Sequence, residues 1–87
     1  MPRHDELIAT LRDVILREFD FAADLPVLGA DTPLFRDGLE LDSFGVVELI
    51  AQLETTLGFE FREDDFREEH FRTVGTLAAL VGRYVAA

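Results

Sequence analysis

The chain has 87 residues, contains no cysteine and carries a formal net charge of −10 at pH 7. This length allows one small domain, residues 1–87, and the lack of cysteine excludes disulfides and thiolate metal sites. The negative charge argues against a nucleic-acid binder, because phosphates would be repelled, and it favours contact with basic surfaces of partner proteins.

Apolar residues make up 48% of the chain, which is enough for one compact core. No apolar run approaches the length of a membrane span. The N-terminus lacks the apolar core of a signal peptide. We therefore expect a soluble, cytoplasmic protein that is monomeric.

The first predicted helix spans residues 5–19, because apolar residues recur there at helical spacing. Residues 20–42 form a long connection rich in aspartate, proline and glycine. Its leucines predict an ordered loop pinned to the helices, and Thr32-Pro33 favours a short helical turn there.

The second predicted helix runs from Ser43 to Leu57, and Gly58 favours its end. Its first residues are unusual, because Phe44 and Gly45 are poor helix formers. The helix has two apolar stripes at 100° per residue. The main stripe holds Val46, Leu49, Ile50, Leu53 and Leu57, and the narrower second stripe holds Phe44, Val47 and Ala51, flanked by Glu48, Thr55 and Glu54.

Two interpretations of the second stripe are open. It packs against another helix, as is common in bundles, or it is an exposed strip that docks a partner.

The remaining chain predicts a short helix over residues 63–69 and a last helix that Thr73 caps and that ends near Val85. Phe66 is expected to face inward, and Phe59, Phe61 and Phe71 to pack in the core. The fold class is therefore all-α: three main helices and one short helix form a small four-helix bundle with a long ordered loop between the first two main helices.

Catalytic chemistry finds little support in this sequence. Neither of the two histidines, His4 and His70, lies near Ser43 in the chain, so no base is placed to activate that serine. Helical metal-ligand spacing and phosphate-binding glycine loops are absent. Ser43 is thus either a plain helix cap or a substrate for another enzyme, held at a helix N-terminus that favours a phosphodiester. We expect no catalytic residues and no metal site.

One stretch carries a resemblance to a known family. Leu41-Asp42-Ser43-Phe44, followed by Val47-Glu48-Leu49-Ile50, resembles the attachment motif of acyl, peptidyl and D-alanyl carrier proteins. In that family the Asp-Ser pair opens the second helix of a small four-helix bundle. A phosphopantetheinyl transferase converts the serine to a 4'-phosphopantetheine ester, using coenzyme A. The likeness covers nearly the whole chain, including the order of its predicted elements.

The resemblance implies roles for individual residues. Ser43 would bear the 4'-phosphopantetheine arm, and Asp42 would help the transferase recognise the site. Partner enzymes would bind the second stripe, which consists of Phe44, Val47 and Ala51, together with the flanking Glu48 and Glu54. The docking interpretation of the second stripe therefore gains support.

The resemblance also implies a function, that of a free-standing carrier rather than an enzyme. Its partners would be the transferase, an adenylating ligase or acyltransferase that loads the arm, and a downstream acyl-accepting enzyme. Residues 38–45 are more similar to D-alanyl and free-standing aminoacyl carriers than to fatty-acid carriers, which favours an aminoacyl or small acyl cargo in a natural-product pathway. The alternatives are a fatty-acid or polyketide carrier, a D-alanyl carrier, and an unmodified helical interaction module.

Overall fold

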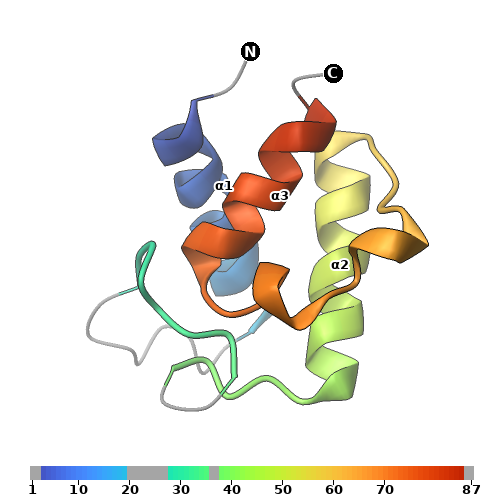
Figure 1. The fold of residues 1–87 in the computed structure, drawn as a ribbon. Coiled ribbons are helices and arrows are strands. Elements are labelled where there is room, and N and C mark those ends of the chain that lie inside the picture. Colours follow the sequence, from blue (N-terminus) through green and yellow to red (C-terminus); the bar gives the residue numbers. More distant parts are fainter. Residues whose placement is uncertain (1–2, 20–27, 36–37, 86–87) are drawn as a thin grey trace.

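Three α-helices form the frame of the computed structural model, which describes residues 3–19, 28–35 and 38–85. They are α1 (His4–Glu18), α2 (Ser43–Leu57) and α3 (Val74–Val85). Each begins and ends within one residue of its predicted bounds. Figure 1 shows α1 and α2 on either side of α3, and α1 packs against both other helices. The predicted all-α fold is confirmed.

The helix ends follow from local chemistry. Gly58 ends α2 in the left-handed conformation, with φ of 71°, and donates its N–H to the Glu54 carbonyl at 2.9 Å. Thr73 caps α3, because its Oγ1 accepts a hydrogen bond from the N–H of Thr76 at 3.1 Å. The end of α2 at Gly58 and the cap of α3 at Thr73 were both predicted from the sequence.

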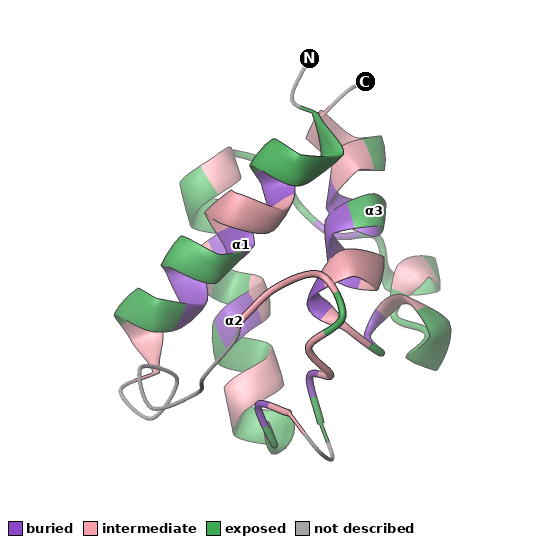
Figure 2. Cartoon of the chain, turned by 90° about the vertical axis from the view of Figure 1, so that its left-hand side faces the viewer, coloured by how far each residue is buried: buried purple, intermediate pink, exposed green. Residues whose placement is uncertain are grey.

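The core is built from the apolar stripes of all three helices. Figure 2 shows the buried residues on the inner sides of α1, α2 and α3, with exposed residues on the outer sides. Burial of this kind is the main force that holds a small helical domain together. The largest fully buried side chains of the helices are Leu11, Val14, Ile15, Leu49, Leu53, Val74, Leu77, Leu80 and Val81.

The loop before α2 is tied to the start of α3. Pro33 and Thr73 form an isolated antiparallel bridge. The N–H of Leu34 bonds the Arg72 carbonyl at 3.0 Å, and the N–H of Gly75 bonds the Ala30 carbonyl at 2.8 Å. The predicted helical turn after Thr32-Pro33 is not seen at residues 33–35, where the backbone pairs with a distant segment instead, and its continuation over residues 36–37 lies outside the described residues.

Three buried leucines, Leu34, Leu39 and Leu41, pin the described part of the loop to the core, as predicted. The N–H of Leu41 bonds the Leu34 carbonyl at 3.0 Å, which brings the two ends of this segment together. The prediction of an ordered loop over residues 20–27 and 36–37 falls outside the described residues.

The connection between α2 and α3 differs from the prediction in two ways. Two 3₁₀ turns, Glu63–Asp65 and Glu68–His70, replace the single short helix. Phe66 lies between them, and its side chain is 48% exposed rather than directed into the core. Its ring lies over Phe61 and Phe71, with centroids 5.9 and 6.2 Å away, so it covers the core from outside. Phe61 and Phe71 are buried as predicted.

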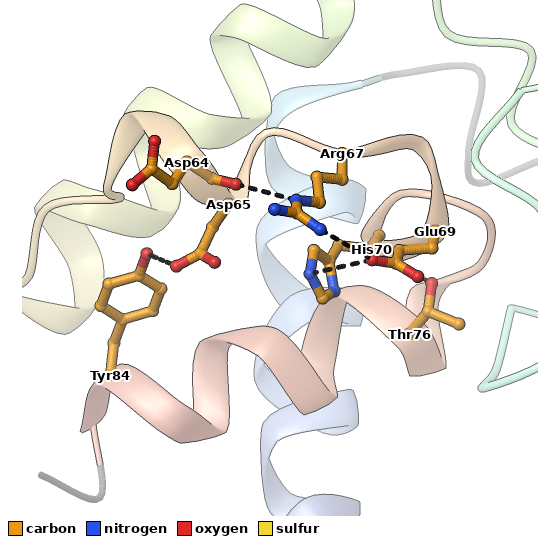
Figure 3. Close-up of polar contacts among 7 residues, drawn as sticks. All are labelled: Asp64, Asp65, Arg67, Glu69, His70, Thr76 and Tyr84. Carbon is orange, nitrogen blue, oxygen red and sulfur yellow. Dashed lines mark hydrogen bonds and ion pairs between the residues drawn. The ribbon is translucent and has the colours of Figure 1, made fainter.

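Tyr84 fastens this connection to α3 (Figure 3). Its hydroxyl donates a hydrogen bond to the Asp65 carboxylate, as Figure 3 shows. The same hydroxyl accepts a hydrogen bond from the N–H of Arg62 at 2.8 Å. Its ring stacks on Phe59 at a centroid distance of 5.1 Å. The hydrogen bond from Tyr84 lowers the pKa of Asp65, whereas burial and then the bond to Asp65 raise the pKa of Tyr84.

Candidate functional site

Asp42, rather than Ser43, caps α2. Asp42 has an extended backbone, and its Oδ1 accepts a hydrogen bond from the N–H of Gly45 at 2.7 Å. Its carbonyl accepts the first intrahelical bond, from the N–H of Val46 at 3.0 Å. This is the geometry of an N-cap aspartate. The carboxylate expected to assist a transferase therefore also stabilises the helix that presents the serine.

Ser43 is the first residue of α2 and is exposed to solvent. Within the described residues its hydroxyl makes no hydrogen bond. The interpretation of Ser43 as a plain helix cap is therefore wrong, because Asp42 already fills that role. The Ser43 hydroxyl is therefore exposed and has no partner among the described residues.

Gly45 allows the cap to close. A Cβ atom at this position would lie 3.3 Å from Asp42 Oδ1 and 3.3 Å from Leu41 Cδ2, which is tighter than ordinary contact. A side chain here would therefore require small shifts of Asp42 or Leu41. Local packing, and not helix propensity, therefore accounts for this residue.

The chain enters the site through an unusual residue that the sequence did not single out. Glu40 has a φ of 53°, and it is the only non-glycine residue with positive φ in the described ranges. Its N–H bonds the Phe35 carbonyl at 2.8 Å, and the next residue, Leu41, is buried. Left-handed backbone favours glycine or asparagine, so a glutamate gave no signal of this conformation.

The second stripe of α2 is exposed. Phe44 is 84% exposed and Val47 is 65% exposed, and Ala51 and Glu48 also face solvent. No element in the described part of the chain covers these side chains. The interpretation that the stripe packs against another helix within this chain therefore receives no support from the described residues, and an open apolar strip beside Ser43 remains.

Glu54 differs from the other candidate contact residues because it is partly buried and hydrogen-bonded. It is half-buried, and its Oε2 accepts a hydrogen bond from the N–H of Phe61 at 2.8 Å. This bond joins α2 to the connection between α2 and α3 (residues 58–73), which we call the aromatic connection. Part of this carboxylate is thus committed to the fold, which the sequence pattern did not indicate.

Two open hollows border α2. The larger, of about 490 Å³, lies at the start of the helix; its described lining residues are Phe19, Glu40, Leu41, Asp42, Phe44, Gly45, Val47 and Glu48. The smaller, of about 280 Å³, lies between α2 and the aromatic connection; its described lining residues are Phe35, Val46, Ile50, Phe66, Arg67, Glu68 and Phe71. Three side chains from outside α2 also line the larger hollow, those of Phe19, Glu40 and Leu41.

The described ranges bring no hydrogen-bonded base to Ser43 and hold no metal-binding cluster. His70 pairs with Glu69, with Nε2 and Oε1 3.9 Å apart, and its carbonyl accepts a hydrogen bond from Thr76 (Figure 3). It has no hydrogen bond or ion pair with Ser43 there. Among residues 3–19, 28–35 and 38–85 no group of three histidine, aspartate or glutamate residues could hold a metal ion. No described helix is long and apolar enough to cross a bilayer.

Comparison with known proteins places these features in context. The family model described as a phosphopantetheine attachment site matches residues 8–81. The match includes Asp42, Ser43 and the whole of α2. Curated proteins and solved structures gave no match.

Proposed function

Since the chain belongs to the phosphopantetheine attachment-site family and is thereby a carrier of covalent 4'-phosphopantetheine, we propose that Ser43 is the attachment residue. One observation carries this proposal: the Ser43 hydroxyl is exposed at the start of α2 while Asp42 performs the capping. Ser43 is also the only serine in the chain, so a serine ester can form nowhere else.

The residues around Ser43 suit the group. The N–H of Gly45 is bonded by Asp42 Oδ1 and that of Val46 by the Asp42 carbonyl. The N–H groups of Ser43 and Phe44 have no partner in the described residues, as is usual for the first residues of a helix. These donors and the positive end of the helix dipole favour a phosphodiester at Ser43.

When attached, the arm supplies a terminal thiol that holds an acyl or aminoacyl group as a thioester. The chain itself provides tethering, which makes each encounter with a partner's active site effectively intramolecular. It also provides docking through Phe44, Val47 and Ala51, with the exposed carboxylate of Glu48 beside them. The chain needs no base or nucleophile for this role, so we propose a substrate of enzymes rather than an enzyme.

The cargo belongs to the proposal as well. The run Gly38–Gly45 is similar to those of D-alanyl and free-standing aminoacyl carriers, and this supports an aminoacyl or small acyl group in a natural-product pathway. An adenylating ligase or acyltransferase would then load the arm, and an acyl-accepting enzyme would receive the group. A fatty-acid or polyketide carrier and a D-alanyl carrier remain the alternatives within the family.

Arm attachment is tested by intact-protein mass spectrometry. The wild-type protein is incubated with coenzyme A and a broad-specificity phosphopantetheinyl transferase. We expect it to gain the mass of one arm, Ser43→Ala to gain none, and the control Thr55→Ala, which removes another exposed hydroxyl of α2, to be modified normally. A wild-type protein that gains no arm would refute the carrier function in favour of an unmodified interaction module. A modified Ser43→Ala would refute the site.

The cargo is tested on the protein once it is armed. Candidate adenylating enzymes with amino acids, and acyltransferases with acyl-coenzyme A donors, are each incubated with it. The thioester formed is identified by its mass. Aminoacyl loading supports the proposed cargo, and loading by long acyl chains alone supports the fatty-acid alternative.

A further inference from the structure

We propose that a third hollow, lined by Arg62, Asp65, Arg83 and Tyr84, is a second contact site for the enzyme that loads the arm, and that it binds a carboxylate side chain of that enzyme. The inference rests on the proposed function, because it requires a loading enzyme. It adds a basic site to a chain whose net charge is −10, and none of its residues belongs to the second stripe of α2.

The hollow lies where the aromatic connection meets the end of α3. Arg62 and Asp65 come from the connection, and Arg83 and Tyr84 come from the last turn of the helix. Figure 1 shows the ends of α2 and α3 at the same end of the molecule, opposite to the start of α2. The hollow is open to solvent and has a volume of about 270 Å³. It is thus smaller than the roughly 300–1,000 Å³ of small-molecule sites, and it suits a single side chain of a partner.

The charges in the hollow favour an anion. Two guanidinium groups and one carboxylate line it, so its net charge is +1. Arg62 and Arg83 are exposed, and neither guanidinium has a hydrogen bond or an ion pair among the described residues. The hydrogen bond from Tyr84 and the positive charge of Arg83 lower the pKa of Asp65, which is therefore ionised at neutral pH. One positive charge remains for a ligand to neutralise.

A single carboxylate matches this site better than other anions do. It carries one negative charge, and a guanidinium group binds it through paired N–H···O bonds. A nucleic acid or an anionic bilayer would bring many negative charges against a chain whose net charge is −10. A second copy of the chain would bring ten more negative charges. The occupant is therefore an acidic side chain of a different protein.

The hollow begins where the second stripe of α2 ends. Glu54 lies two turns after Val47 on the same side of the helix. Its Oε2 accepts a hydrogen bond from the N–H of Phe61 at 2.8 Å. Phe61 directly precedes Arg62, whose N–H bonds the Tyr84 hydroxyl at 2.8 Å. These contacts connect the stripe to the hollow without a break.

One enzyme is large enough to cover both surfaces. The helix rises about 15 Å from Val47 to Leu57, and a standard interface of about 800 Å² per partner is roughly 30 Å across. The loading enzyme acts on a thiol at the far end of the arm, so its contacts need not surround Ser43. A basic group beside Glu48 and an acidic group in the hollow would fix the orientation in which this enzyme binds.

The two arginines can be exchanged without removing a contact that holds the fold. The group of Arg62 that bonds Tyr84 is the backbone N–H, which a glutamate at this position also supplies. The Arg83 side chain is exposed and has no hydrogen bond among the described residues. Charge reversal at either position therefore tests binding.

The test measures loading of armed variants by the adenylating enzyme or acyltransferase that loads the armed wild type. Arg62→Glu and Arg83→Glu are each expected to lower kcat/KM for loading about tenfold, mainly through a higher KM, and the effect should shrink as salt is raised. The matched control Arg12→Glu makes the same change at an exposed arginine of α1 and should load normally. Thermal unfolding checks that all variants fold.

Loading of both hollow variants at the wild-type rate would overturn the proposal. Equal slowing of Arg12→Glu would assign the effect to net charge and overturn the site. Arm transfer by the transferase is measured on the same variants and should be unchanged, and equal slowing of transfer and loading would overturn the assignment to the loading enzyme. Failure of the proposed function gives a different result, because the wild-type protein then gains no arm.

Two other occupants are distinguished by separate measurements. A second copy of the chain would give self-association of the wild type that Arg83→Glu abolishes, as measured by sedimentation. A free anion would give saturable binding of inorganic phosphate that Arg83→Glu abolishes, as measured by calorimetry. Either result, together with unchanged loading of the hollow variants, would replace the proposed carboxylate of the loading enzyme.

Discussion

The start of α2 and the connection that follows its end use aromatic side chains in opposite ways. Phe44 projects into solvent and is 84% exposed, whereas Phe61 is 6% exposed and its ring lies 4.7 Å from that of Phe59. Backbone contacts and the Asp42 cap hold the first region, so the side chains of Phe44 and Val47 stay exposed. Side chains themselves hold the second region, through stacked rings and the contact between Tyr84 and Asp65.

Under the proposed function, this difference separates the residues that stabilise the domain from those that would bind partners. A protein that several enzymes must bind needs an exposed surface whose residues can contact a partner while the domain stays folded. The aromatic connection lies beyond the other end of α2 and closes the core there. Changes in the two regions should therefore affect different measurements.

The largest expected effect on stability distinguishes two phenylalanines. Phe61→Ala should lower the free energy of unfolding by about 3–4 kcal/mol, because a buried ring leaves a cavity. Phe44→Ala removes the same atoms from an exposed site and should change stability by less than about 0.5 kcal/mol. Urea unfolding followed by circular dichroism measures both. Equal destabilisation by the two changes would show that the comparison is wrong.

A change on the exposed stripe should affect partners and not the fold. Val47→Asp is expected to slow loading of the armed protein about tenfold, because a charge enters an apolar contact surface. Helicity should be retained, since Val47 is 65% exposed. Ala79→Asp, at an exposed position of α3, is the matched control and should load normally. Loss of helicity in Val47→Asp would place this residue in the core and remove the docking surface.

A smaller effect is expected at the Tyr84 hydroxyl. Tyr84→Phe keeps the ring that stacks on Phe59 but removes the hydrogen bonds with Asp65 and Arg62. The free energy of unfolding should fall by about 1 kcal/mol. Arm attachment at Ser43 should be unchanged, because the contact belongs to the other region.

The contact between Tyr84 and Asp65 also predicts how the stability difference between the wild type and Tyr84→Phe depends on pH. The pKa of Asp65 lies below its ordinary value of 3.8, so its contribution is present above that value and is lost as pH falls through the lowered pKa. The pKa of Tyr84 is raised above 10.0, so its contribution is present below pH 10.0 and is lost as pH rises through the raised pKa. The stability gap between the wild type and Tyr84→Phe should therefore be widest near neutral pH and narrow at both extremes. A gap that does not change with pH would contradict this role of the contact.

Helix positions could be predicted because apolar residues repeat at helical spacing. Leu7, Leu11 and Val14 mark α1, and Gly58 and Thr73 mark helix ends that the structure confirms. The exposed stripe of α2 could be located by the same periodicity. The family match confirms the resemblance that the Asp42-Ser43 motif indicated, and with it the covalent 4'-phosphopantetheine.

The remaining features depend on contacts that no local pattern encodes. Aspartate and serine are equally good caps, so the sequence alone did not show that Asp42 rather than Ser43 caps α2. Phe66 looked like a core residue, but two 3₁₀ turns leave its ring on the outside. The hydrogen bonds from the Phe61 N–H to Glu54 and from the Tyr84 hydroxyl to Asp65 join residues on different elements, and the spacing of apolar residues does not indicate them.

The pairing of the loop with α3 has a consequence for the order in which the chain is completed. The segment before Ser43 is held by backbone bonds from Leu34 to Arg72 and from Gly75 to Ala30. A ribosome must therefore synthesise the chain through Gly75 before this segment can take its final position. The final position of the segment before Ser43 therefore depends on residues that are synthesised about thirty positions after the serine.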